Sequence, residues 1–343
     1  MSPARAKVSR EPHLRSVTES REFTVAPEHA GTRLDRFLAT ELPELSRSRI
    51  QSFIDEGRVR VNGAAPKASQ RVQAGETIAI EIPPAAPAGV EPEPIALDVI
   101  YEDDDIAVIN KPANMIVHPG AGKDAGTLVA ALLHHFGGAD ALSNVGGPLR
   151  PGIVHRLDKG TSGAMVIARN DAAHKKLVEE FRDRQVQKTY VALLHGRAKG
   201  ESGRIDMPIA RDLRRRTRMT TRRREGRPAR TDWRVRLRLD GFTLVEADLH
   251  TGRTHQIRAH FSALGTPVVG DTVYGAPLQE RVSGKSLAPL GRNFLHAARI
   301  AFEHPRTGEL VEFRAPLPHE LRSYFRALAA AVGISVDDSS LNA

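Results

Sequence analysis

The residues that could do chemistry are concentrated in the segment 152–163, which reads GIVHRLDKGTSG. In this segment Asp158 directly follows His155, Arg156 and Leu157. A carboxylate can serve as a nucleophile or a base if a pocket excludes water and a neighbouring cation keeps it ionised. Taken alone, the same aspartate could be an ordinary turn or capping residue. The segment is therefore a candidate catalytic loop whose meaning depends on the rest of the chain.

Two other chemistries that these residue types suggest are weaker. His155, Asp158 and Ser162 could be imagined as a hydrolase triad, but they crowd into eight residues, and no Gly-x-Ser-x-Gly elbow accompanies them. The glycine-rich stretch 120–127 matches neither nucleotide-phosphate spacing and is expected to be a loop. A metal site is disfavoured because three histidines five residues apart share no face of a helix or strand: His250, His255 and His260. We therefore expect neither a metal nor a cofactor.

The segment HRLDKGTSG resembles the catalytic loop of the RluA family of pseudouridine synthases, in which the aspartate, here Asp158, is the essential residue. Three further segments are similar to family motifs and follow in family order. They are DIAVINKP at 105–112 with VHP at 117–119, KTYVAL at 188–193, and LHTGRTHQIRAH at 249–260. The similarity extends over about residues 100 to 316. It implies an isomerase that breaks the C1′–N1 bond of uridine and forms a C1′–C5 bond without redox cofactor or metal.

The resemblance also assigns roles to single residues. It implies that Asp158 is the catalytic nucleophile or base and that Arg258 is its ion-pair partner. Tyr190 would stack on the target base, and its phenol could assist proton removal at C5. Arg156 would contact the RNA backbone or fill the space of a flipped-out nucleotide. Three consecutive residues would shape the loop and position the substrate: His155, Arg156 and Leu157.

A second resemblance covers residues 31–67. The segments GTRLDRFL at 31–38, SRSRIQ at 46–51 and GRVRVNG at 57–63, with Lys67, resemble the small S4 (αL-type) RNA-binding domain. Helical spacing predicts a helix from about Leu34, and a second helix that Ser46 could cap. The two helices would present a basic face to structured RNA. The residues expected on this face are Arg33, Arg36, Arg47, Ser48 and Gln51.

Positive charge is concentrated in one stretch of the chain. Residues 211–230 contain ten arginines against Asp212 and Glu225, a balance of 10 − 2 = +8, whereas the whole chain carries only +9. Arginine-rich segments suit phosphate, and charges this dense repel one another unless a polyanion neutralises them. The alternative is a solvated surface loop. We favour RNA contact. The stretch falls where the resembled family has a hairpin that grips RNA, and we predict that arginines particular to this chain contact phosphate there: Arg214, Arg215, Arg216 and Arg218.

Composition bounds the fold. The chain has 343 residues, 50 Lys and Arg against 41 Asp and Glu, 40% hydrophobic residues and no cysteine. Such a chain can bury a core, whereas disulfides, iron–sulfur clusters and thiolate catalysis are excluded. The expected class is α+β, an S4 domain followed by a mixed, mainly antiparallel sheet domain. The expected ranges are a disordered basic arm at 1–22, the S4-like domain at 23–82, a proline-rich linker at 83–94, the catalytic domain at 95–332 and a tail at 333–343.

Periodicity predicts several elements of the catalytic domain. We expect helices at 171–184 and 317–331, and strands at 99–101, 106–109, 188–195, 232–239 and 242–249. The basic, polar start of the chain does not resemble a secretory signal, and no apolar run approaches a membrane span, so we expect a cytoplasmic protein.

The leading hypothesis is a monomeric synthase that modifies specific uridines of large-subunit (23S) ribosomal RNA. The alternative is a non-catalytic S4-type RNA-binding or ribosome-assembly factor.

Overall fold

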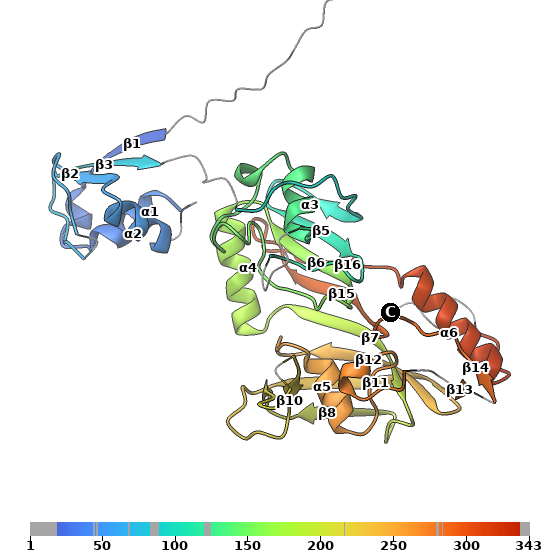
Figure 1. Cartoon of the computed structure of the whole chain (residues 1–343). Helices are drawn as coiled ribbons and strands as arrows, with labels where there is room; N and C mark the ends of the chain where they lie inside the picture. Colours follow the sequence, from blue (N-terminus) through green and yellow to red (C-terminus); the bar gives the residue numbers. More distant parts are fainter. Residues whose placement is uncertain are drawn as a thin grey trace, which may run out of the picture. The chain divides into compact units, whose positions relative to one another are not determined.

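The structure is a computed structural model, and it describes residues 19–43, 45, 47–67, 69–82, 89–119, 125–215, 217–278, 281–282 and 284–336. The chain divides into two compact units, Met1–Ala86 and Pro87–Ala343 (Figure 1). The boundary falls inside the segment 83–94 that the sequence predicts as a linker. Among the described residues, no helix has the length and apolar character needed to cross a membrane.

The first unit is a three-stranded antiparallel sheet packed on two helices. Its strands lie in the order β1-β3-β2. Its elements are β1 (Glu19–Thr24), the 3₁₀ turn η1 (Pro27–His29), α1 (Leu34–Glu41), α2 (Arg47–Asp55), β2 (Val59–Val61) and β3 (Thr77–Ile82). Strand β1 pairs with β3 along its whole length, which corrects the predicted arm at 1–22, because the arm cannot extend past residue 18. Residues 1–18 and the predicted cap Ser46 lie outside the described residues.

Helical spacing explains the core of this unit. Leu34, Phe37 and Leu38 lie on one side of α1 and are buried together with Ile78 and Ile80 of β3. The two helices predicted for this unit are therefore confirmed.

The second unit is built on one nine-stranded sheet, with the order β4-β5-β6-β15-β7-β12-β11-β8 and with β16 paired to β15. Its strands are β4 (Val99–Glu102), β5 (Ile106–Lys111), β6 (Ser162–Ala168), β7 (Gln187–His195), β8 (Ser202–Asp206), β11 (Arg230–Leu239), β12 (Phe242–Leu249), β15 (Leu295–Glu303) and β16 (Leu310–Arg314). The β6–β15 pair is parallel, and the other strand pairs of this sheet are antiparallel. The prediction of a mixed, mainly antiparallel sheet is confirmed.

Alternate residues of the central strands enter two different cores. In β6, Met165 and Ile167 belong to the core that includes α3 (Leu128–His135), whereas Ala164 and Val166 face α4 (Asp171–Asp183). Both faces of this strand are thus buried, which explains its unbroken apolar sequence. The remaining helices are α5 (Gln256–Ala263) and α6 (His319–Ala331), with short 3₁₀ turns η2 (Ala139–Ala141) and η3 (Thr272–Tyr274). Two small hairpins are β9 (Ala210–Arg211) with β10 (Met219–Thr220), and β13 (Arg281–Val282) with β14 (Lys285–Ser286).

The second half of the predicted linker belongs to the second unit. Val90 is buried in its core, the Glu93 amide donates to the Ala130 carbonyl, and the Glu93 carboxylate accepts from the Gly126 amide. The linker prediction is therefore too long at its C-terminal end, because Val90 supplies an apolar anchor within a segment dominated by proline and alanine. Residues 83–88 and 337–343 lie outside the described residues.

Candidate active site

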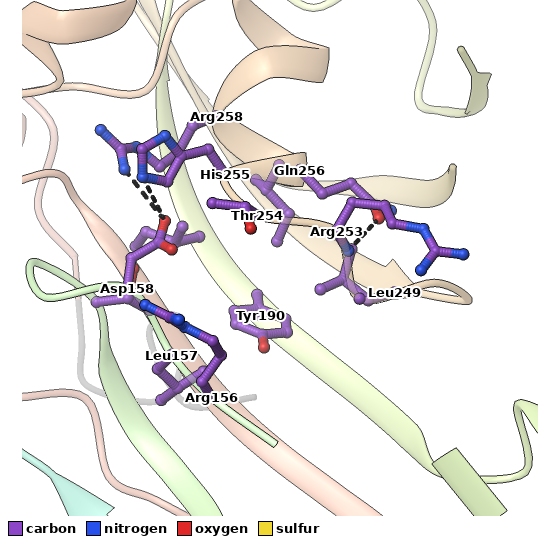
Figure 2. A pocket seen from close by; sticks show the side chains of 14 residues that line it. Arg156, Leu157, Asp158, Tyr190, Leu249, Arg253, Thr254, His255, Gln256 and Arg258 are labelled. Atoms are coloured by element: carbon purple, nitrogen blue, oxygen red, sulfur yellow. Dashed lines mark hydrogen bonds and ion pairs between the residues drawn. The ribbon is translucent and has the colours of Figure 1, made fainter. Parts of the chain in front are cut away.

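Asp158 lines a pocket in the second unit. It follows the buried Leu157 in the loop that precedes β6, and the amide of Thr161 closes a turn onto its carbonyl. Its Oδ2 lies 3.1 Å from Nη1 of Arg258 and 3.8 Å from Nε2 of His255 (Figure 2). The carboxylate is 17% exposed, so a small substrate group can reach it. The predicted ion pair between Asp158 and Arg258 is present.

The guanidinium of Arg258 is fixed by a second carboxylate. Arg258 projects from α5, and its Nε and Nη2 donate to Oδ2 and Oδ1 of Asp271 at 2.6 and 3.0 Å. Burial opposes its charge, but the two carboxylates Asp271 and Asp158 together raise the pKa of Arg258 above its ordinary value. Because Asp271 takes one edge of the planar group, the remaining Nη1 points to Asp158 in a defined direction.

Tyr190 forms another wall of the pocket. It lies on the central strand β7, opposite Ala247 of β12 and Ala297 of β15, and is only 8% exposed. Figure 2 shows its ring beside the Asp158 loop, where both residues line the pocket. Burial, and then the negative charge of Asp158, raise the pKa of the Tyr190 phenol well above its ordinary range. The phenol is therefore neutral and can stack against a base or donate a hydrogen bond.

The three residues before Asp158 differ in what they contact. His155 stacks on Phe181, with ring centroids 4.7 Å apart, and its Nε2 accepts the Val166 amide at 3.0 Å. Burial, with a smaller effect of Lys188, lowers the pKa of His155 to about 3, so the ring is neutral. Leu157 packs into the core, whereas Arg156 is exposed. His155 and Leu157 thus hold the loop, and Arg156 is the exposed side chain of the three.

These contacts also remove the hydrolase-triad alternative. Ser162 lies 2.9 Å from Nδ1 of His296 and accepts a hydrogen bond from Arg292, so it is not directed at His155. The next residue, Gly163, has φ +119°, and a Cβ there would overlap the backbone of Ala297. The end of the motif therefore serves to bring β15 against β6.

The first family motif contacts the loop that carries Asp158. Lys111 at the end of β5 is fully buried, and its Nζ donates to the carbonyls of Pro112 and Met115 at 2.7 and 3.0 Å. These bonds fold the following turn so that the Asn114 amide donates to the Lys159 carbonyl at 2.7 Å. The lysine thus positions the turn on which the Asp158 loop rests.

A wide basic groove adjoins the pocket. The two share Arg156, Tyr190, Leu249, Gly252 and Arg253 in their walls. Among the described residues that line the groove, none is acidic. Its cationic or titratable nitrogen groups are His118, Arg150, His155, Arg156, Arg182, Arg184, Lys188, Arg227, His250 and Arg253. Such a surface suits a polyanion.

The arginine-rich stretch does form a hairpin, β9 with β10, but its arginines have different environments. Arg214 and Arg215 are exposed, and their amides donate to Asp212. Arg216 lies outside the described residues. Arg218 instead packs over the ring of Tyr274, with its Cζ 5.1 Å from the ring centroid. The sequence suggested that Arg218 contacts phosphate. In the structure its guanidinium is instead in contact with a buried aromatic ring.

The predicted RNA face of the S4 unit is organised by a residue that the sequence motifs did not single out. Asp35 is fully buried in α1 and accepts hydrogen bonds from Arg33, Arg47 and Gln51 at 2.8 to 3.1 Å. Burial alone would raise the pKa of Asp35, but these donors lower it well below its usual range. Arg33 and Arg47 remain about half exposed. Arg36 is exposed, and the side chain of Ser48 lies outside the described part of the chain.

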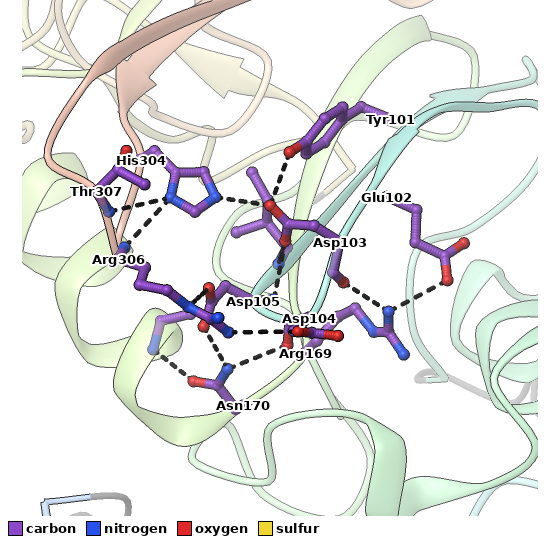
Figure 3. Close-up of polar contacts among 12 residues, drawn as sticks. Tyr101, Glu102, Asp103, Asp104, Asp105, Arg169, Asn170, His304, Arg306 and Thr307 are labelled. Atoms are coloured by element: carbon purple, nitrogen blue, oxygen red, sulfur yellow. Dashed lines mark hydrogen bonds and ion pairs between the residues drawn. The ribbon is translucent and has the colours of Figure 1, made fainter.

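The three histidines of the third motif serve separate contacts. His250 pairs with Asp232, and the buried His260 lies within hydrogen-bond distance of the Thr231 hydroxyl and the Met207 carbonyl. His255 alone lies beside Asp158. The residues Asp103, Asp105 and His304 do form a compact cluster, but its carboxylates are already engaged by other groups (Figure 3). Arg306 and Asn170 contact Asp105, and two backbone amides donate to Asp103.

Sequence reasoning missed His255 and Asp271 as parts of the site. His255 has a positive φ of 55° at the start of α5, and Asp271 is a buried acid two residues after the apolar pair Val268 and Val269, with Gly270 between them. A charged residue within an apolar run was the available signal for Asp271.

Comparisons with known proteins agree with this geometry. The sequence profile of the family described as RNA pseudouridylate synthase matches residues 105–263, and that of the S4 domain matches residues 32–78. A protein of Chloroflexus aurantiacus named an uncharacterised RNA pseudouridine synthase is 49% identical, over 90% of this chain and 94% of its own. The ribosomal large subunit pseudouridine synthase D of Neisseria meningitidis serogroup B is 41% identical, over 95% of this chain and 86% of its own.

A solved structure agrees as well. That of human RNA pseudouridylate synthase domain containing 1 has a TM-score of 0.51 and 31% identity, and the match covers 69% of this chain and 87% of the human chain. With its S4 domain followed by a sheet domain that carries the Asp158 pocket, this chain belongs to the RNA pseudouridine synthase family and is an isomerase.

Proposed function

We propose that this synthase isomerises uridines of large-subunit ribosomal RNA and that Asp158 is its catalytic carboxylate. The observation that carries the assignment of Asp158 is its ion pair with Arg258, made in a pocket where Asp271 fixes the guanidinium. The substrate class is supported by the relative in Neisseria meningitidis, whose name specifies the large ribosomal subunit.

The proposed reaction needs a carboxylate that is held in one orientation by a cation. The C1′–N1 bond of uridine breaks, the base turns, and a C1′–C5 bond forms, while C5 loses a proton and N1 gains one. Asp158 starts this sequence as a nucleophile or a base. Arg258 holds the carboxylate in one orientation and keeps its negative charge compensated as the substrate excludes water.

Tyr190 has the geometry of a platform for the target base. Its buried ring lies next to Asp158, and aromatic stacking is how flipped bases are commonly held. Because the Tyr190 pKa is raised, the phenol is a poor proton acceptor at neutral pH. We therefore assign to Tyr190 the stacking role in preference to that of a base at C5.

RNA binding is divided between two surfaces. In the second unit, the basic groove leads into the pocket, and exposed Arg156 lies where the two meet. In the first unit, the Asp35 cluster presents Arg33 and Arg47. We propose further that the synthase acts as a monomer on ribosomal RNA in the cytoplasm.

The test is a map of pseudouridines in ribosomal RNA from cells that lack the gene, complemented by wild type or by Asp158→Asn. Sites that only wild type restores would support both the substrate and the residue assignment. The non-catalytic alternative predicts that no pseudouridine depends on the gene. If sites depend on the gene but lie in transfer or messenger RNA, the substrate assignment is wrong. If Asp158→Asn restores them, Asp158 is not the catalytic residue.

A further inference from the structure

Tyr274 lies between the catalytic pocket and the arginine-rich hairpin. It closes the 3₁₀ turn η3, three residues after Asp271, and is 2% exposed. Its carbonyl accepts a hydrogen bond from the Ser262 hydroxyl at 2.8 Å, which fixes the turn to α5. The side chain therefore has a defined place relative to Arg258, which belongs to the same helix.

Toward the pocket, Tyr274 contacts two residues that face Asp158. The Cζ atom of Arg258 lies 4.9 Å from its ring centroid, within the range of a cation–π contact. Its hydroxyl lies 3.0 Å from Nδ1 of His255, whose Nε2 lies 3.8 Å from Oδ2 of Asp158. The tyrosine thus touches both nitrogen groups that approach the carboxylate.

Toward the hairpin, the same side chain contacts β10 and its neighbours. The Met219 amide donates to the Tyr274 hydroxyl at 2.8 Å, and Arg218 packs over the ring. Nε of Arg218 is buried and has no hydrogen-bond partner among the described residues. Beneath the hairpin, Tyr274 also shares a small apolar cluster with Ile209, Met219, Ala229 and Ala259.

The Tyr274 hydroxyl connects the Met219 amide to the His255 ring. It has one proton to donate, and it already accepts the Met219 amide. Its own proton is then available for Nδ1 of His255. A histidine that accepts at Nδ1 and is neutral carries its proton on Nε2, the atom that faces Asp158. The position of Met219 therefore bears on the tautomer and the ring orientation of His255.

We infer that Tyr274 is a positioning residue. It couples the position of the hairpin at residues 209–220 to the alignment of His255 and Arg258 beside Asp158. RNA that binds the hairpin would thereby affect the chemical step as well as the affinity. The inference rests on the proposed catalytic role of Asp158.

The first test removes only the Tyr274 hydroxyl. Single-turnover rates of Tyr274→Phe are measured with the full chain in excess over unmodified, in-vitro-transcribed large-subunit ribosomal RNA. Tyr101→Phe is the matched control, because it also removes a hydrogen-bonded hydroxyl, the one that donates to Asp103 beside the edge strand β4. The saturated rate of Tyr274→Phe should fall roughly tenfold, as expected for a misaligned catalytic group. Tyr101→Phe should keep the wild-type rate. A Tyr274→Phe rate within about twofold of wild type would overturn the inference.

The second test compares two arginines of the same hairpin. Arg218→Ala removes a charge that contacts Tyr274, whereas Arg214→Ala removes an exposed one. The coupling predicts that Arg218→Ala lowers the saturated rate about fivefold more than Arg214→Ala does. If both variants raise the half-saturating concentration and affect the saturated rate equally, the hairpin acts through affinity alone and the coupling is wrong.

Failure of the proposed function can be told apart from failure of the coupling. Turnover by Asp158→Asn would refute the catalytic assignment whatever Tyr274 does. If wild type does not modify this RNA, the substrate proposal fails, and amide hydrogen exchange decides the coupling. Exchange in peptides from the hairpin and from the start of α5 should then be faster in Tyr274→Phe than in Tyr101→Phe. Equal exchange in both segments contradicts the inference.

Discussion

Arg258 shows how one side chain can organise a site. Its planar guanidinium contacts two carboxylates in fixed directions, Asp271 through one edge and Asp158 through the remaining Nη1. An ammonium group has the same charge but no planar edge, so it cannot reproduce both contacts at these distances. The contribution of Arg258 to the site is therefore geometric as well as electrostatic.

We predict that Arg258→Lys keeps the fold but lowers the single-turnover rate about a hundredfold, because the lysine cannot align Asp158 while it pairs with Asp271. The rate of pseudouridine formation at saturating enzyme measures this. Arg306→Lys is the control, since Arg306 also pairs with an aspartate, Asp105, away from the pocket. Equal rates for the two variants would show that charge alone is needed.

At the scale of residues, the sequence predicts the centre of the site better than its surroundings. Asp158, Tyr190 and Arg258 come from separate motifs, and the structure places all three around one pocket, as the family resemblance implied; their catalytic roles are our proposal. Asp271 and Tyr274 lie outside those motifs. Their importance depends on a turn that brings them under α5, which spacing along the chain does not reveal.

At the scale of elements, prediction succeeded where polar and apolar residues separate cleanly. The helix predicted at 171–184 is α4, and the helix predicted at 317–331 is α6. Helix α5 was not predicted, because six of its eight residues are buried and three of these are polar, which hides its amphipathic pattern. Those buried polar residues are Gln256, Arg258 and His260.

The S4 unit offers a test of how an element presents its charges. Asp35→Ala adds a net positive charge, so charge alone predicts tighter RNA binding. We predict weaker binding, because Arg33, Arg47 and Gln51 lose the acceptor that orders them. Removal of these hydrogen bonds should also destabilise the unit by about 1–3 kcal/mol. Affinity for ribosomal RNA and thermal unfolding would be compared with those of Asp55→Ala, an exposed position on α2. Tighter binding by Asp35→Ala would contradict the prediction.

The turn between β4 and β5 gives a prediction on pH. Burial alone would raise the pKa of Asp103, but the Ile106 and Asp105 amides, Tyr101 and His304 lower it to about 2. Because the folded-state pKa is depressed, the stabilisation is complete above about pH 4 and is lost as the pH falls toward about 2.

Asp103→Asn should therefore be less stable than wild type at pH 7, by about 2 kcal/mol, with a difference that shrinks between about pH 4 and 2. Urea unfolding at several pH values measures this difference. The control is Asp104→Asn, whose side chain is 86% exposed. A difference that does not change with pH would show that ionisation of Asp103 is irrelevant to stability.

At the scale of the whole molecule, basic side chains gather on several parts of the second unit. The basic groove, the hairpin and the pocket lie on the same unit, whereas the chain as a whole has only a modest excess of positive charge. The sequence showed the dense arginine stretch but not the groove, because the groove draws its cations from segments between residues 118 and 253. Only the fold brings these segments together.

This distribution predicts how RNA binding depends on salt. Replacement of Arg214 and Arg215 by alanine should flatten the dependence of log K on log salt by about 0.7 to 0.9 for each phosphate that the variant no longer neutralises. Arg218→Ala should flatten it less, because that guanidinium packs on Tyr274. Arg322→Ala on α6, outside the groove, controls for net charge. Equal slopes for Arg214→Ala and Arg322→Ala, which each remove one positive charge, would mean that Arg214 does not contact phosphate. A slope change for Arg218→Ala as large as for Arg214→Ala would mean that Arg218 leaves Tyr274 when RNA binds.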